Sequence, residues 1–148
     1  MNILVVEDDS FKFSKIETLI ENTLGKVKIT RFDNIHDTVI YFESNIPDKI
    51  ILDMSLPSHA AKVGEGSPLS MPAGGIEIIL ELKSLNMIDI PILILTQYPE
   101  IEIENEYYSI DESGIEIKNI YGINNLAVVL YENDSSDWKD EAVDFLRL

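Results

Sequence analysis

The sequence contains no cysteine among its 148 residues. This absence excludes disulfides, thiolate metal sites and cysteine nucleophiles. Basic residues are scarce, because 11 Lys and Arg stand against 27 Asp and Glu, and the formal net charge is −16. Nucleic-acid binding needs a basic surface and anionic membranes attract basic segments, so both kinds of partner are disfavoured. The acidity indicates either a soluble surface alone or cationic partners, metal ions included.

Long hydrophobic runs are also missing. The longest, "IPILIL" and "LAVVLY", are far shorter than the roughly 20 residues that span a bilayer. The first residues, "MNILVVEDDS", have no basic leader of the kind that opens a signal peptide. We therefore expect a cytoplasmic protein, and a chain of this length fits one domain that buries about 70% of its unfolded surface.

Short apolar segments alternate with helical patterns along the chain. This alternation predicts right-handed βαβ units and a mostly parallel sheet with helices on both faces. Two segments depart from it: 58–73 has no period and reads as a long loop, and 97–125 is expected to be irregular or partly helical. The expected strands are 2–7, 26–32, 49–54, 90–96 and 126–131, and the expected helices are one capped by Ser10 and stopped by Gly25, one capped by Asn34, 74–85 and 137–148.

Acidic residues follow two of the expected strands. Glu7, Asp8 and Asp9 end the first strand and Asp53 ends the third, while Thr96 ends the fourth. The ends of parallel strands share one edge of the sheet, where α/β proteins bind ligands. Each like-charge contact at about 4 Å costs roughly 4 kcal/mol at an intermediate dielectric, and a divalent cation removes that cost. All-oxygen ligands suit Mg²⁺ or Mn²⁺; the alternative is that these acids only solvate the strand ends.

Three motifs in combination resemble the receiver domain of two-component response regulators. They are "ILVVEDD", then "IILDMSLP" with Asp53 45 positions after Asp8, then "PILILT" with Thr96 43 positions after Asp53. The resemblance implies a flavodoxin-like (βα)₅ fold, a doubly wound parallel sheet of strand order 2-1-3-4-5, in a single domain over residues 1–148. It also implies a Mg²⁺-dependent phosphorelay function rather than an enzyme.

The resemblance assigns a role to each matching residue. Asp53 would accept a phosphoryl group from a histidine kinase or a phosphotransfer protein. Asp8 and the backbone carbonyl of Ser55 would bind the metal ion with Asp53, and Glu7 would hold it through water. Thr96 would hydrogen-bond the phosphoryl group and sense the modification.

The sequence departs from the family at several points. The family has a lysine at the end of its fifth strand, whereas "LAVVLYEND" has none there. Lys139, in the first turn of the closing helix, is the nearest cation, either reaching back to the site or remaining in solvent. Gln97 and Tyr98 follow Thr96, where the family has a small residue. The loop 58–73 is longer than usual, and 97–125 replaces part of the usual output surface.

Two other functions compete with the phosphoacceptor. The first is a pseudo-receiver, which uses the same fold as a docking module without phosphorylation. The second, less favoured, is a metal-dependent phosphohydrolase with Asp53 as the nucleophile. Such enzymes often use a second acid two positions later as the general acid-base, and Ser55 occupies that place. No output domain follows in the sequence, so the resemblance implies action either through another, downstream protein or as a phosphate relay or sink.

Overall fold

The computed structural model describes all 148 residues. Its centre is a five-stranded parallel sheet of order β2-β1-β3-β6-β9, which is the 2-1-3-4-5 order of the flavodoxin-like fold. The predicted fold class is thereby confirmed. The sheet strands are β1 (Asn2–Val6), β2 (Lys28–Phe32), β3 (Lys49–Leu52), β6 (Ile92–Thr96) and β9 (Leu126–Leu130). None of the helices is long and apolar enough to cross a membrane.

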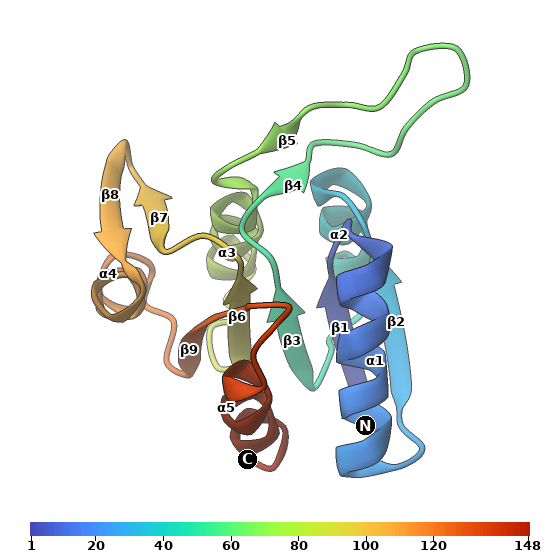
Figure 1. Cartoon of the computed structure of the whole chain (residues 1–148). Helices are drawn as coiled ribbons and strands as arrows, with labels where there is room; N and C mark the ends of the chain where they lie inside the picture. The colour runs from blue at the N-terminus through green and yellow to red at the C-terminus, as the bar shows by residue number, and fades with distance from the viewer.

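Five helices cover the two faces of the sheet (Figure 1). α1 packs against α5 on one face, and α2, α3 and α4 form a row on the other. Side chains of the central strands alternate between the two resulting cores: Ile3, Val5 and Ile51 face α1 and α5, whereas Leu4 and Val6 face α2 and α3. The helices are α1 (Ser10–Leu24), α2 (Ile35–Phe42), α3 (Gly74–Ser84), α4 (Ile110–Tyr121) and α5 (Asp137–Leu146).

The first helix begins differently from the prediction. Its N-cap is Asp9 rather than Ser10, because the Asp9 carboxylate accepts hydrogen bonds from the backbone N–H groups of Phe11 and Lys12. The predicted stop at Gly25 is confirmed, with φ at +74°. The cap at Asn34 is also confirmed, since its side chain accepts from the Asp37 N–H.

The segment 97–125 is more regular than predicted. It holds an antiparallel hairpin, β7 (Glu100–Ile103) with β8 (Glu106–Ser109), followed by α4. The tight turn at Glu104 and Asn105 has positive φ at both residues, which matches the right-handed twist of a two-residue hairpin. The alternation of Ile101 and Ile103 with glutamates buries only the isoleucines.

The segment 58–73 extends away from the sheet (Figure 1). Two short strands, β4 (Leu56–Pro57) and β5 (Ser70–Met71), pair at its base, and a single bridge joins Lys62 to Gly66 near its tip. Both this loop and the β7–β8 hairpin extend from the edge at which the sheet strands end. That edge therefore holds the acids and the two unusual insertions together.

Candidate functional site

Strand register gathers the predicted acids into one row. Val6 pairs with Leu52, and Leu52 pairs with Ile94, so the next residues along these strands are Glu7, Asp53 and Leu95. Because neighbouring residues of a strand point to opposite faces, Glu7 and Asp53 share the α1 side with Val5 and Ile51. Both carboxyl groups are almost completely buried, Glu7 at 1% and Asp53 at 4% exposure.

The acids form a cluster that can hold a metal ion. Glu7, Asp8 and Asp53 each offer a carboxylate oxygen, and these oxygens lie within 4.8 Å of one another. Asp8 is exposed, whereas the other two are buried, so the cluster opens to solvent on the Asp8 side. An all-oxygen set of this kind suits a hard divalent cation such as Mg²⁺.

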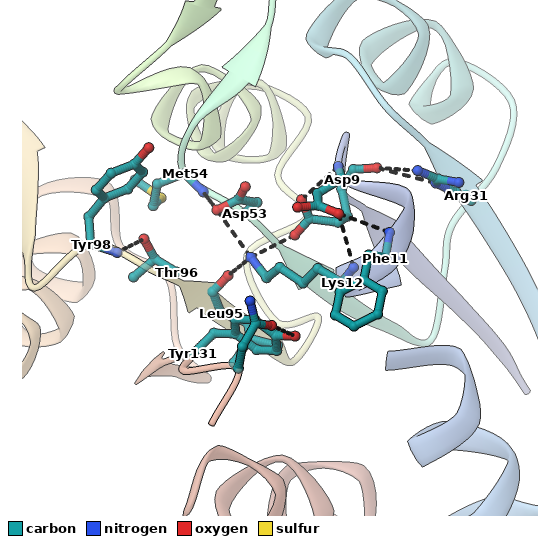
Figure 2. Close-up of polar contacts among 12 residues, drawn as sticks. Asp9, Phe11, Lys12, Arg31, Asp53, Met54, Leu95, Thr96, Tyr98 and Tyr131 are labelled. Atoms are coloured by element: carbon teal, nitrogen blue, oxygen red, sulfur yellow. Dashed lines mark hydrogen bonds and ion pairs between the residues drawn. The ribbon is translucent and has the colours of Figure 1, made fainter. Parts of the chain in front are cut away.

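A buried lysine that sequence reasoning missed lies inside this cluster. The Lys12 Nζ is 2.6 Å from Glu7 Oε1 and 3.5 Å from Asp53 Oδ1, and it donates a hydrogen bond of 2.7 Å to the carbonyl of Leu95. Figure 2 shows the Lys12 side chain reaching across from the start of α1 toward Asp53 and Leu95. Both ion pairs between side chains in the structure are made by Lys12.

The pattern of α1 contains the signal for this lysine. Lys12, Ile16 and Ile20 are the buried residues of the helix, and they follow one another at intervals of four. The apolar stripe that begins at Ile16 therefore extends one turn back to Lys12. A lysine on a buried stripe needs an acidic or carbonyl partner, and the strand-end acids supply it.

Burial opposes ionisation of both buried acids. It raises the pKa of Glu7 to about 8, even though the Lys12 ammonium pulls this pKa down. Burial also raises the pKa of Asp53, and Lys12 and the Met54 N–H partly offset the effect. The protonation of both carboxyl groups therefore depends on the charges around them in the site.

Backbone contacts hold the two buried acids in place. The Met54 N–H donates to Asp53 Oδ1 over 2.8 Å, and the Asp9 N–H donates to Glu7 Oε2 over 3.1 Å. The Arg31 guanidinium binds the carbonyl of Glu7 through two N–H groups, each at 3.2 Å. The cluster is therefore fixed from several elements rather than by one flexible loop.

The predicted Thr96 ends β6 beside this row and is fully buried. Its Oγ1 accepts a hydrogen bond of 3.2 Å from the backbone N–H of Tyr98, as Figure 2 shows. Its carbonyl accepts from the Tyr131 N–H over 2.7 Å. Thr96 thereby links the sheet to the segment that leads into the β7–β8 hairpin.

Two adjacent glycines allow α3 to approach the end of β3. A Cβ on Gly75 would lie 2.6 Å from the carbonyl oxygen of Asp53 and 2.7 Å from Met54 Sδ. A Cβ on Gly74 would lie 3.0 Å from Leu56 Cβ and from the Leu56 carbonyl. The Gly75 N–H in turn donates to the Met54 carbonyl over 2.9 Å, which fixes the chain after Asp53.

An open groove of ≈ 470 Å³ lies along the residues that follow Asp53 and along Thr96. Met54, Ser55 and Thr96 line one end, and Tyr98 and Tyr107 line the end toward the β7–β8 hairpin. The Ser55 hydroxyl is 2.7 Å from that of Ser70 and so ties the base of the 58–73 loop to the same edge. Both insertions thus border the approach to the site.

The structure does not bring Lys139 to the acids. Its Nζ lies 5.9 Å from the centre of the Trp138 ring, and its side chain lines a separate surface hollow with Phe11 and Lys15. At the end of β9 the chain instead places Tyr131, whose ring centre is 5.3 Å from the Lys12 Nζ. The cation of the cluster comes from α1.

Comparison with solved structures shows the fold. The receiver domain of a sensor histidine kinase from Pseudomonas aeruginosa PAO1, solved with a magnesium ion in its active-site cleft, matches with a TM-score of 0.62 at 18% identity over 99% of this chain and 93% of its own. The phosphorylated cyanobacterial phytochrome response regulator RcpA matches with a TM-score of 0.59 at 18% identity over 99% of this chain and 88% of its own.

Comparison of sequences shows the family. No protein-family model matches the sequence. The Detocs response regulatory protein DtcB of Enterobacter cloacae (strain JD6301) is 24% identical over 97% of this chain and 96% of its own. DtcB of Vibrio alginolyticus is 45% identical over 147 residues, which cover 98% of this chain and 99% of that protein. At that identity along nearly the whole of both chains, the protein belongs to the family of Detocs response regulatory proteins, DtcB, and its fold is that of a response regulator receiver domain.

Proposed function

We propose that the whole chain, residues 1–148, is a phosphoacceptor receiver domain that takes a phosphoryl group on Asp53. The observation that supports this most strongly is the placement of Asp53: a buried carboxylate at the end of a central strand, grouped with two further acids. The proposed donor is a histidine kinase or a phosphotransfer protein, and the proposed readout is altered binding to a downstream protein. Such donors work in the cytoplasm, so the proposal places the protein there.

The cluster fits a magnesium ion. Asp8, Asp53 and the backbone carbonyl of Ser55 would bind it directly, and Glu7 would hold it through water. The oxygens of the three acids lie close enough together for one ion, and the magnesium-containing receiver domain from Pseudomonas aeruginosa has the same fold. When bound, Mg²⁺ supplies positive charge that offsets the negative charge of the acids and of the phosphoryl group.

The proposed reaction is a displacement at phosphorus. A lone pair on one carboxylate oxygen of Asp53 forms the O–P bond of an acyl phosphate. The electron pair of the donor's P–N bond leaves with the histidine ring, which departs as neutral imidazole after the ring takes up one proton from solvent. The Met54 N–H holds the Asp53 carboxylate in one orientation for this attack.

Thr96 and its neighbours are the proposed route to the readout. A phosphoryl group adds about −1.5 to −2 of charge and strong acceptor oxygens. The Thr96 hydroxyl already accepts from the Tyr98 N–H, so turning it toward the phosphoryl group would change the contact with the chain leading into β7. The β7–β8 hairpin would then be the surface whose partner binding changes.

The test is phosphorylation by a small donor. Acetyl phosphate with Mg²⁺ should add one phosphoryl group to the wild-type protein, measured by intact mass, and nothing to Asp53→Asn. Asp33→Asn, which changes an exposed acid near the same edge, is the matched control and should behave as wild type. Unmodified wild-type protein, with no beryllofluoride binding by calorimetry in the presence of Mg²⁺, would contradict the proposal.

A pseudo-receiver is the second candidate, and one observation favours it. Lys12 already contacts both buried acids, so the cluster has a counter-charge without any metal ion. A protein of this kind would bind its partner equally well with and without acetyl phosphate. The same mass measurement separates the two functions.

A further inference from the structure

Lys12 is buried on the apolar stripe of α1, a position that the fold could fill with an apolar residue. Its side chain is 1% exposed, at the first turn of α1, in line with the apolar residues Ile16 and Ile20. An apolar residue at this position would extend the core between α1 and the sheet. Burying an ammonium group instead is unfavourable unless acceptors surround it.

The surroundings of the ammonium group belong to the phosphorylation site. Two of its three acceptors, Glu7 and Asp53, directly follow β1 and β3, and the third is the carbonyl of Leu95, near the end of β6. Leu95 immediately precedes Thr96. The one cation of the cluster thus touches the reacting carboxylate and the backbone next to the sensing hydroxyl.

The end of β9 presents an aromatic ring to the same point. The Tyr131 ring centre is 5.3 Å from the Lys12 Nζ and 5.0 Å from the Trp138 ring, while the Tyr131 hydroxyl donates to Asn133. The Tyr131 ring therefore makes a cation–π contact with the ammonium group. No positive charge enters the cluster from this side.

We propose that Lys12 supplies from α1 the positive charge that pairs with the phosphoryl group on Asp53, in place of a cation from the fifth sheet strand. This inference rests on the proposed phosphorylation of Asp53. In the unmodified protein the ammonium lies closer to Glu7, at 2.6 Å, than to Asp53, at 3.5 Å. The new negative charge on Asp53 competes with Glu7 for it, and the flexible lysine stem allows the small shift.

The experiment compares initial rates of Asp53 phosphorylation by acetyl phosphate at saturating Mg²⁺. Lys12→Met keeps the side-chain length but removes the charge, and should lower the rate by roughly 10²- to 10³-fold, as loss of one charge-stabilising group does in other sites. Lys139→Met removes the cation that lies outside the cluster and should leave the rate unchanged. Thermal unfolding of each variant shows whether it is folded.

A relocated cation distinguishes a charge effect from a packing effect. In the double variant Lys12→Met Tyr131→Lys the ammonium enters from the end of β9, and we expect at least about tenfold recovery of the rate lost in Lys12→Met. Tyr131→Lys alone reports the effect of losing the aromatic ring. A folded Lys12→Met with the wild-type rate, or a folded double variant with no recovery, would overturn the inference.

The wild-type protein gives an independent readout if Lys12→Met does not fold. In a crystal structure with Mg²⁺ and beryllofluoride, the Lys12 Nζ should lie within hydrogen-bond distance of a fluoride on Asp53. A bound analogue that Lys12 does not contact would overturn the inference but leave the proposed function intact. Absence of both analogue binding and phosphorylation in the wild type would remove the proposed function and the inference together.

Discussion

β3 begins at one buried lysine and ends beside another. Lys49, its first residue, is 4% exposed, and its Nζ donates to the last two carbonyls of α5, Phe145 at 3.0 Å and Leu146 at 2.7 Å. Its third acceptor is an oxygen of the final residue, Leu148, at 3.1 Å. Lys12 also has three acceptors, but two of them are the carboxyl groups of Glu7 and Asp53. The two ends of β3 thus hold similar ammonium groups that have different kinds of acceptor.

The difference separates a structural charge from a responsive one. At the amino end of β3 the ammonium meets the negative end of a helix dipole, whose charge is fixed. At the carboxyl end it meets acids whose charge changes with protonation, metal binding and, as proposed, phosphorylation. The same side chain therefore anchors a helix at one edge of the sheet and balances a variable site at the other.

The largest expected effect comes from removing the structural cation. Lys49→Met should lower the free energy of unfolding by roughly 3 kcal/mol, because hydrogen bonds from a charged donor to the last carbonyls of α5 are lost. Urea denaturation measures the change, and Lys28→Met, at an exposed position at the start of β2, should stay within about 0.5 kcal/mol of wild type. A folded Lys49→Met protein that no longer accepts a phosphoryl group would break the distinction between the two lysines.

We expect Mg²⁺ to bind only at the edge of the sheet that holds Glu7, Asp8 and Asp53. At a concentration about 100 times its dissociation constant, Mg²⁺ should raise the free energy of unfolding of the wild type by roughly 2.7 kcal/mol. Asp8→Asn should lose most of this gain, because Asp8 is the exposed acid of the cluster, while Asp33→Asn should keep it. Equal stabilisation of the Asp8→Asn and wild-type proteins would place the ion elsewhere.

The next prediction concerns the close approach of α3, at Gly75, to the backbone of Asp53. Gly75→Ala should cost roughly 2 kcal/mol, because a Cβ there would overlap the Asp53 carbonyl and the Met54 sulfur. Gly114→Ala is a matched control in α4, since its Cβ would meet only Val128 Cγ2 at an ordinary 3.5 Å. It should be neutral or stabilising by up to about 1 kcal/mol. If both variants lose the same stability in thermal or urea unfolding, the close approach of α3 to β3 is not the cause.

Counted over a single pH unit, the smallest effect is a pH dependence of stability at the edge of the sheet that holds Glu7. Burial raises the pKa of Glu7 from 4.5 to about 8 in the folded protein, so between these values the folded state holds a proton that the unfolded state has lost. The free energy of unfolding of the metal-free protein should therefore fall as pH rises through this window, by at most about 1.4 kcal/mol per pH unit from this group. In Glu7→Gln the decline should be shallower, as followed by urea denaturation at several pH values. A slope equal to that of the wild type would assign the decline to other groups.

Strand pattern and parallel pairing allowed the acidic row to be predicted from the sequence. Glu7, Asp8 and Asp53 follow apolar runs whose ends must share one edge once the strands are parallel, and the structure brings the three together. The closing helix is a second case: a helix was predicted over 137–148, and α5 covers Asp137–Leu146, with Trp138, Ala142 and Phe145 buried at helical spacing on one side. Local periodicity decides such features, so one sequence suffices.

Features that depend on contacts between distant residues were missed. Lys49 and Phe145 are 96 positions apart, and Lys12 and Leu95 are 83 apart, so no local pattern pairs them. The β7–β8 hairpin was missed for a different reason. Apolar and acidic residues alternate over 100–103, but the whole of 97–125 was predicted to be irregular or partly helical, and the structure has both a hairpin and α4 there. In α3, helical spacing groups Ile76, Ile79, Leu80 and Leu85, but only Ile76 and Ile79 of these are buried. The helix turns Ile78 and Leu82 toward the core on its side of the sheet and leaves Leu80 and Leu85 exposed.

The central claim is that the acid at the end of β3 receives the phosphoryl group. The most direct measurement treats the wild-type protein with acetyl phosphate and Mg²⁺, reduces any acyl phosphate with borohydride, and locates the resulting homoserine by peptide mass spectrometry. The account predicts homoserine at position 53 only, and none when the metal ion is chelated. Homoserine at another aspartate, or none at all in folded protein that binds Mg²⁺, would contradict it.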